Sequence, residues 1–265
     1  MTIQQDPGAR VLIGLRGVEK TYQTVDGPLS SLRAVSFEVR EGEFLSIVGP
    51  SGCGKSTLLK ILAGLLPATG GEARINDRLV DGPQDGVGMV FQSPVLLAWR
   101  DVLSNVMLQV EVRGLPWEPY KRRALDLLQT VGLAGFERKH SWELSGGMQQ
   151  RVAICRALVH DPSLLLMDEP FGALDAMTRE LMNLELQRIW MATKKTVLFV
   201  THSIPEAVFL SDRVLVMTER PGTVDKIYDI SMPRPRSLKN MGTAEFSELA
   251  QAIRGHFFAQ GIVDH

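Results

Sequence analysis

A glycine-rich loop at residues 49–57 carries the residue types and spacing with the clearest chemical meaning in this sequence. It reads Gly-Pro-Ser-Gly-Cys-Gly-Lys-Ser-Thr and matches the phosphate-binding pattern G-x-x-x-x-G-K-[ST]. Its glycines let the backbone turn tightly enough for several N–H groups to converge on a polyphosphate. The residues of this loop, hereafter the phosphate loop, are the predicted phosphate-binding residues: Gly49, Pro50, Ser51, Gly52, Cys53, Gly54, Lys55, Ser56 and Thr57.

Three polar side chains at the end of the phosphate loop have predicted roles. Lys55 reaches the β- and γ-phosphates of a nucleotide, the Ser56 hydroxyl binds Mg²⁺, and the Thr57 hydroxyl holds the α-phosphate. The loop alone fits a kinase, a GTPase, a motor or a transporter ATPase, so other residues must decide among these classes.

The segments on either side of the loop provide the context that the motif requires. Residues 43–48 form a short apolar, β-branched run typical of a buried strand. Apolar residues then recur at helical spacing over residues 56–63, ahead of Pro67. The loop is therefore predicted to join a strand to the N-terminus of a helix, where the helix dipole favours an anion.

Two carboxylates and a histidine follow two further apolar runs. Residues 164–167 precede Asp168 and Glu169, which predicts a buried strand that delivers both acids at its carboxyl end. Downstream of a phosphate loop, Asp168 can hold Mg²⁺ and Glu169 can orient or deprotonate a water molecule. Residues 196–200 form a similar apolar strand ahead of His202.

Two helix starts are marked by a serine. Ser145 is followed by Gly146 and Gly147 and then by a helical pattern, so this start offers backbone donors to an anion, and it equally fits a flexible helix start. Ser203 and Glu206 form the pattern of a capping box around a proline in the first turn.

The composition is that of an ordinary globular protein. The 265 residues are 45% hydrophobic and 22% charged, and the net charge of −1 argues against a nucleic-acid-binding protein. No apolar run approaches the ~18 to 20 residues that span a bilayer, and residues 1–10 lack the form of a signal peptide. We therefore expect a cytosolic chain in which Cys53 and Cys155 are free thiols.

The other segments predict a mixed α/β chain. Residues 11–40 alternate polar and apolar, which favours antiparallel strands flanking the strand of the phosphate loop, and residues 71–91 continue as short strands. The pattern is helical from about residue 96 to residue 160. Beyond residue 235 the apolar spacing predicts one amphipathic helix that packs on the body of the same subunit.

Six motifs in order give the sequence a family resemblance: over roughly residues 11–230 it resembles the ATP-binding subunits of ATP-binding cassette (ABC) transporters. The motifs are Tyr22 as the adenine-stacking aromatic, residues 49–57 as Walker A, Gln92 as the Q-loop, 144–148 as the signature, 164–169 as Walker B and His202 as the switch histidine. Residues 173–175 fit the D-loop of this family.

The resemblance implies the fold and its division. The fold is a P-loop NTPase core of the RecA-like α/β class, with an antiparallel β subdomain and an inserted α-helical subdomain at about residues 94–160. The ATP-binding domain spans residues 1–235, and a helical tail spans residues 236–265.

The resemblance also implies the chemistry of the site, with ATP and Mg²⁺ as cofactors. Ser56, Gln92 and Asp168 are the implied Mg²⁺ ligands. Glu169 is the implied catalytic base, His202 holds the γ-phosphate, and Gln92 senses Mg²⁺ and the attacking water.

The implied partners follow from the family's assembly. Two copies of the chain pair head to tail, so that Ser145 and Gly147 contact the γ-phosphate across the dimer. The segment after Gln92 receives a cytoplasmic helix of a transmembrane permease, and a solute-binding protein acts indirectly through that permease. The resemblance implies no nucleic-acid partner. It implies that the subunit lies peripherally at the cytoplasmic face of the inner membrane. Met148 departs from the commonest signature, which has Gln, and a thioether donates no hydrogen bond.

Within the family, residues 94–102, 202–213 and 219–222 are most similar to the ATPases of nitrate, sulfonate and taurine importers. The resemblance therefore implies an ATPase that energises the import of a small anion. The alternative is a family member that acts in DNA repair or translation, which would need a long coiled coil before the signature or two cassettes in one chain. A regulator without turnover would lack Glu169 or His202, and both are present.

Overall fold

The computed structural model describes residues 10–259. The chain divides into two compact units, Met1–Gln84 with Lys194–His265 (unit 1) and Asp85–Thr193 (unit 2). The expectation about a signal peptide concerns residues 1–10, which lie almost entirely outside the described ones. The predicted domain boundary at residue 235 and the predicted insertion at about residues 94–160 stay predictions.

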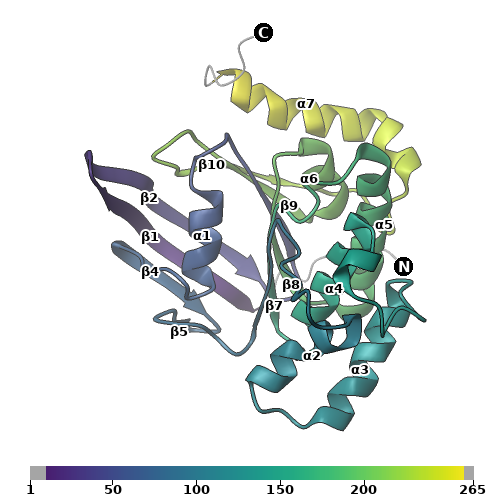
Figure 1. Cartoon of the computed structure of the whole chain (residues 1–265). Helices are drawn as coiled ribbons and strands as arrows, with labels where there is room; N and C mark the ends of the chain where they lie inside the picture. Colours follow the sequence, from purple (N-terminus) through teal and green to yellow (C-terminus); the bar gives the residue numbers. More distant parts are fainter. Residues whose placement is uncertain (1–9, 260–265) are drawn as a thin grey trace. The chain divides into compact units, whose positions relative to one another are not determined.

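Unit 1 holds an antiparallel sheet in the order β2-β1-β4-β5 (Figure 1). Its strands are β1 (Val11–Thr24), β2 (Gly27–Arg40), β4 (Gly70–Ile75) and β5 (Arg78–Leu79). Leu12, Ile13 and Leu15 are all buried, so a side-chain period of two does not describe the start of β1, where the pairing with β2 shifts register between Val11 and Ile13. The expectation that the first strands flank the strand of the phosphate loop is wrong, because β1 and β2 pair with each other in this sheet, whereas residues 44–48 pair with residues 196–200 and 213–217.

The strand of the phosphate loop belongs to a second sheet, whose order within unit 1 is β10-β9-β3-β8. These strands are β3 (Phe44–Val48), β8 (Thr196–Val200), β9 (Arg213–Met217) and β10 (Val224–Asp229). All five residues of β3 are buried between β8 and β9, both of which run parallel to it. A parallel strand buried on both faces is usually apolar along its length, and the one polar residue of β3, Ser46, is hydrogen-bonded to the Ser211 hydroxyl.

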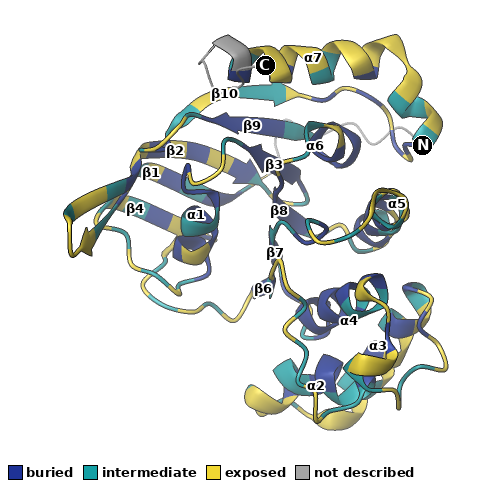
Figure 2. Cartoon of the chain, turned by 45° about the horizontal axis from the view of Figure 1, so that its top comes forward, coloured by how far each residue is buried: buried dark blue, intermediate teal, exposed yellow. Residues whose placement is uncertain are grey.

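Unit 2 pairs β6 (Val87–Val90) with β7 (Leu164–Asp168) in parallel. Its helices are α2 (Val102–Val112), α3 (Trp117–Thr130), η1 (Ser141–Glu143), α4 (Gly146–Leu158) and α5 (Ala176–Thr193). Helix α4 is buried on most of its surface (Figure 2). The predicted helical stretch is confirmed as three α-helices and the short η1. Residues 113–116 and 131–140 are not helical and interrupt it, and no helix forms between residue 96 and Val102.

The helices of unit 1 include the predicted C-terminal one. They are α1 (Lys55–Leu62), α6 (Ile204–Leu210), η2 (Leu238–Gly242) and α7 (Ala244–Ala259). Helix α7 contacts α6 (Figure 1) and buries Phe246, Ile253 and Phe257. The expectation that the tail helix packs on its own subunit is confirmed.

A buried arginine ties the segment before α7 to α6. Arg236 is 1% exposed and donates hydrogen bonds to the carbonyls of Val208, Phe209 and Ser211 at the end of α6. Burial lowers the pKa of Arg236 to about 9, so the guanidinium stays charged at neutral pH. A cation is favourable at this end of a helix, where carbonyls have no partner within the helix.

None of the helices within residues 10–259 combines the length and the apolar character that crossing a membrane would require.

Candidate functional site

The phosphate loop connects β3 to α1 and has the backbone that the pattern predicts. Gly52 and Gly54 have φ angles of 76° and 108°, a region that side chains disfavour. A Cβ at Gly54 would lie 2.6 Å from Leu32 Cδ2 and 3.0 Å from the Ser31 carbonyl oxygen. Gly54 is also the N-cap of α1, so the first N–H groups of this helix have no side-chain cap and suit an anion.

Lys55 folds back over the phosphate loop. The side chain is buried, and its Nζ donates hydrogen bonds to the Gly49 and Pro50 carbonyls at 2.8 and 2.9 Å. The same Nζ lies 3.9 Å from Cys53 Sγ. Burial raises the pKa of the Cys53 thiol, and Lys55 opposes this shift without reversing it. The Cys53 thiol is therefore neutral at neutral pH.

Tyr22 lies beside the phosphate loop. Its hydroxyl is 3.1 Å from Thr57 Oγ1, and the Ser31 hydroxyl donates a hydrogen bond of 3.4 Å to the same oxygen. Lys20 Nζ is 5.3 Å from the centre of the Tyr22 ring. Tyr22, the predicted adenine-stacking residue, thus contacts Thr57, the predicted α-phosphate residue. Ser31 was missed by the sequence analysis, since no spacing pattern links it to the loop.

His202 follows β8 at the start of α6 and is exposed. Its neighbour Thr201 donates its N–H to the Ile47 carbonyl of β3 at 3.2 Å, just before the phosphate loop. Ser203 Oγ accepts the N–H of Glu206 and caps α6, which confirms that half of the predicted capping box. The buried Glu206 carboxylate accepts a hydrogen bond of 2.6 Å from the Thr201 hydroxyl.

The predicted acids and Gln92 belong to unit 2. Asp168 is the last residue of β7, and Glu169 follows it with φ = 44°, a strained angle for a residue with a side chain. A Cβ at Gly172 would lie 3.4 Å from Gln92 Nε2 and 3.6 Å from Glu169 Oε2. Gly172, which the sequence analysis missed, therefore leaves space beside both the Gln92 amide and the Glu169 carboxylate.

The signature residues lie at the N-terminus of α4. Ser145 is exposed, and its Oγ caps the helix by accepting the N–H of Met148 at 3.3 Å. Gly147 is buried, and a Cβ there would lie 3.0 Å from Thr178 Cγ2 on α5. Asp175 caps α5 by accepting the Thr178 N–H at 3.0 Å, and hydrogen bonds from Thr178 lower the pKa of the Asp175 carboxyl.

Helix α5 was missed by the sequence analysis. The signal that could have found it is the apolar spacing i, i+4, i+7 and i+8 behind the Asp175 cap. The buried residues at this spacing are Met182, Leu186, Ile189 and Trp190.

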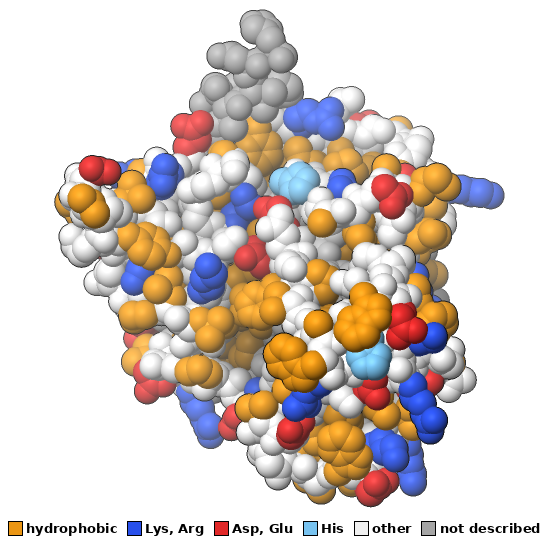
Figure 3. Space-filling model, in the orientation of Figure 1, with side chains coloured by type: hydrophobic (Ala, Val, Ile, Leu, Met, Phe, Trp, Pro, Cys, Tyr) orange, Lys and Arg blue, Asp and Glu red, His pale blue; other side chains and the backbone are white. Residues whose placement is uncertain are grey.

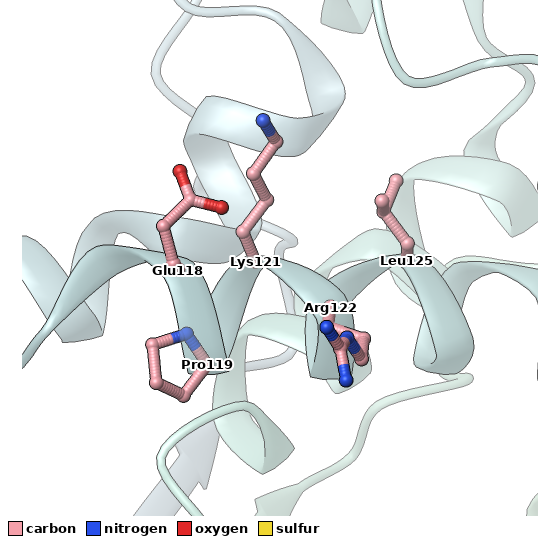
Figure 4. Close-up of a pocket in the computed structure, with 5 residues that line it drawn as sticks. All are labelled: Glu118, Pro119, Lys121, Arg122 and Leu125. Atoms are coloured by element: carbon pink, nitrogen blue, oxygen red, sulfur yellow. The ribbon is translucent and has the colours of Figure 1, made fainter.

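The predicted site residues fall into two groups, one in each unit. Unit 1 carries Tyr22, the phosphate loop and His202, and unit 2 carries Gln92, the signature, Asp168 and Glu169. A surface hollow of about 540 Å³ in unit 2 belongs to neither group, because residues of α3 line it (Figure 4): Glu118, Pro119, Lys121, Arg122 and Leu125. None of the predicted site residues contributes to that lining.

Comparisons with known proteins show the family to which the chain belongs. A family profile described as ABC transporter matches residues 32–172. The chain is 46% identical over 237 residues to the uncharacterized ABC transporter ATP-binding protein MJ0412 of Methanocaldococcus jannaschii, covering 89% of each chain. It is 46% identical over 217 residues to the taurine import ATP-binding protein TauB of Jannaschia sp., covering 82% of this chain and 81% of that protein.

A further relative and a solved structure complete the comparison. The aliphatic sulfonates import ATP-binding protein SsuB of Bacillus cereus is 39% identical over 251 residues, with coverage of 95% of this chain and 98% of that protein. The ATP-binding cassette MJ0796, in a dimeric post-hydrolysis state bound to ADP and Pi, is 34% identical with a TM-score of 0.72, covering 83% of this chain and 99% of that chain. The predicted P-loop NTPase fold is confirmed by this similarity.

Proposed function

The chain belongs to the ABC transporter family as an ATP-binding subunit that hydrolyses ATP, and from this premise we propose that it powers the import of a small organic sulfonate. The cargo class rests on the relatives named for taurine import and for aliphatic sulfonate import. Taurine is itself a sulfonate, so both names point to the same anionic group. A role in DNA repair or translation is not favoured by these relatives.

The observation that carries the proposed nucleotide site is the backbone of the phosphate loop. The positive φ angles of Gly52 and Gly54 and the uncapped start of α1 leave N–H groups for a polyphosphate. When ATP binds, Lys55 exchanges the loop carbonyls that it now contacts for β- and γ-phosphate oxygens, which are stronger acceptors because they are charged. In this proposal Tyr22 stacks on the adenine and Thr57 contacts the α-phosphate.

Mg²⁺ fits the donor set that the sequence predicts. Ser56, Gln92 and Asp168 offer oxygen donors, and Mg²⁺ prefers oxygen ligands and keeps several waters and substrate phosphates around it. Bound there, the ion neutralises charge that develops on the phosphates.

Hydrolysis in this proposal depends on three side chains. A bond forms between a water oxygen and the γ-phosphorus while the bond from that phosphorus to the bridging oxygen breaks, and Glu169 takes the proton from the water. Gln92 orients the same water, which agrees with the Gln92 amide and the Glu169 carboxylate both lying beside Gly172. His202 donates a hydrogen bond to the γ-phosphate.

The proposed working form is a head-to-tail dimer of this chain. The exposed Ser145 hydroxyl and the Gly147 N–H lie at the N-terminus of α4, where an anion is favoured. They would contact the γ-phosphate of a nucleotide held by the phosphate loop of the second copy. Met148 adds no hydrogen bond near this nucleotide, and the contacts of Ser145 and Gly147 do not depend on it.

The dimer is proposed to bind permease subunits and thereby to lie peripherally at the cytoplasmic face of the inner membrane. Hydrophobic side chains reach the surface at several points on the face shown in Figure 3. In the segment after Gln92, Val95 is 57% exposed and Trp99 is 75% exposed. Exposed aromatic residues are typical anchors of protein interfaces. A solute-binding protein would act on the permease and not on this subunit.

Trp99→Asp is expected to lower co-purification of the subunit with its permease by tenfold or more, since aromatic anchors at interfaces are worth roughly 2 kcal/mol or more. The melting temperature and the ATP affinity of the isolated subunit stay unchanged, because Trp99 is largely exposed. Trp117→Asp on α3 is the matched control and leaves co-purification intact. Equal recovery of permease with Trp99→Asp and with wild type would remove Trp99 from the proposed interface.

The cargo is tested by growth of cells from which this chain is deleted. Growth on taurine or an alkanesulfonate as the sulfur source is expected to be lost, while growth on sulfate is retained. A plasmid carrying the wild-type chain restores growth, and one carrying Glu169→Gln does not. Normal growth on every sulfonate and on nitrate, together with loss of a cationic or sugar nutrient, would contradict the sulfonate assignment.

A further inference from the structure

The segment that contains Gln92 has no regular structure of its own. Residues 91–100, hereafter the Q segment, lie between β6 and α2 and contain no helix or strand. A segment of this kind cannot pair its own backbone groups, so other parts of the protein or water must satisfy them.

Buried polar side chains from two helices hold the backbone of the Q segment. From α4, Gln150 Nε2 donates to the Phe91 carbonyl at 3.4 Å, and Arg156 donates to the carbonyls of Pro94 and Val95 at 2.7 and 2.8 Å. From α2, the Asn105 side chain accepts the Leu97 N–H at 2.8 Å and donates to the Leu97 carbonyl at 3.1 Å. The backbone on both sides of Gln92 is therefore held by α4.

Burying the Arg156 guanidinium to hold the Q segment costs free energy. Arg156 is 9% exposed, and burial lowers the pKa of its guanidinium. The hydrogen bonds found for it within residues 10–259 go to the two carbonyls of the Q segment, and no ion pair there includes it. Burying a charge without a carboxylate partner is unfavourable, so an apolar side chain would be the less costly way to fill this space.

The Q segment is also strained where Arg156 holds it. Val95 has φ = 46°, and a β-branched residue disfavours this left-handed region. Its side chain is 57% exposed, so burial of that side chain does not explain the strain. The two carbonyl bonds from Arg156 are contacts that keep this conformation in place.

We infer that Arg156 is a positioning residue for Gln92 and that it links the signature helix to the hydrolytic centre. The inference rests on the proposed role of Gln92 as the residue that orients the attacking water. Helix α4 begins at the exposed cap Ser145 and reaches the Q segment through Gln150 and then Arg156. A phosphate that binds at the start of this helix and moves the helix therefore also moves the backbone on both sides of Gln92. The Gln92 amide lies beside Gly172, as does the Glu169 carboxylate.

A double-mutant cycle tests whether Arg156 acts through Gln92. Arg156→Met is expected to lower kcat about 10- to 100-fold, the size of effect that a displacement of about 1 Å can cause, and to leave the affinity for a fluorescent ATP analogue within about twofold. In the Gln92→Ala background, Arg156→Met is expected to change kcat less than about twofold. Arg156→Lys keeps a cationic donor and loses the two-pronged guanidinium that reaches both carbonyls, so its kcat is expected to lie between those of Arg156→Met and the wild type. Single-turnover hydrolysis of radiolabelled ATP provides the rates.

Arg151→Met is the matched control on the same helix. Arg151 donates to the Val131 carbonyl at 3.0 Å, outside the Q segment. Arg151→Met therefore loses a comparable hydrogen bond, and Gln92→Ala is expected to lower kcat by the same factor in this background as in the wild type. If the defects of Arg156→Met and Gln92→Ala instead multiply in the double variant, Arg156 acts independently of Gln92 and the inference is wrong.

Hydrogen exchange of the purified subunit gives a second readout that needs no turnover. Amides of residues 91–100 are expected to exchange faster in Arg156→Met and not in Arg151→Met, while peptides of α1 are unchanged in both. Unaltered exchange of the Q segment in Arg156→Met would contradict the inference. A wild-type chain that hydrolyses no ATP would contradict the proposed function, so the two failures are distinguishable.

Discussion

Glu169→Gln is expected to bind ATP normally and to hydrolyse it ~10² to 10⁴ times more slowly than the wild type, which is the usual contribution of a general base. The glutamine amide has nearly the shape of the carboxylate and cannot accept the proton of the attacking water. The backbone at this position keeps its φ of 44°, which glutamine tolerates no worse than glutamate. Phosphate release measures the rate, and equilibrium dialysis measures the affinity for ATP.

Glu180→Gln is the matched control for this prediction. Glu180 is an exposed residue of α5 in the same unit, so the same chemical change there is expected to leave both turnover and ATP affinity unaltered. Phosphate release by Glu169→Gln within a few-fold of the wild-type rate would show that another group takes the proton.

The second large effect is expected in a mixed dimer, because the proposed site uses the phosphate loop of one copy and the signature of the other. One subunit carries Lys55→Ala and its partner carries Ser145→Arg, and both carry Glu169→Gln so that bound ATP persists. In either homodimer every site has one damaged half, so neither homodimer retains nucleotide. In the mixed dimer both lesions fall in the same site and the other site is intact. Radiolabelled ATP that survives gel filtration is therefore expected at one per mixed dimer and near zero in each homodimer.

The controls for the mixed dimer follow from the local structure. Ser145 caps α4, so Ser145→Arg is expected to cost about 1 kcal/mol of stability, and thermal unfolding must confirm that the subunit stays folded. Light scattering must confirm that dimers form. If each site were made within one subunit, both subunits of the mixed dimer would carry a damaged site, and mixing them would restore no binding. Folded mixed dimers that retain no ATP would count against the head-to-tail arrangement.

Features that depend on a few neighbouring residues follow from the local sequence alone. The phosphate loop could be predicted because the φ angles of Gly52 and Gly54 and the start of α1 are set by glycine positions inside nine consecutive residues. The caps Ser145 and Ser203 are local for the same reason, since each accepts an N–H three residues further along. The buried strand β3 was predictable from a short run that is apolar except for Ser46.

The partners of strands and of buried polar groups, in contrast, depend on how distant segments pack in the folded chain. The strands of residues 11–40 were placed beside β3 by the sequence interpretation, whereas β1 pairs with β4, because alternation specifies a strand and not its neighbour. Nothing in the spacing of the chain links Arg156 to Pro94 and Val95, or Gly172 to Gln92. A buried guanidinium finds its acceptors among groups that the fold brings near, and those of Arg156 lie 61 and 62 residues away along the chain.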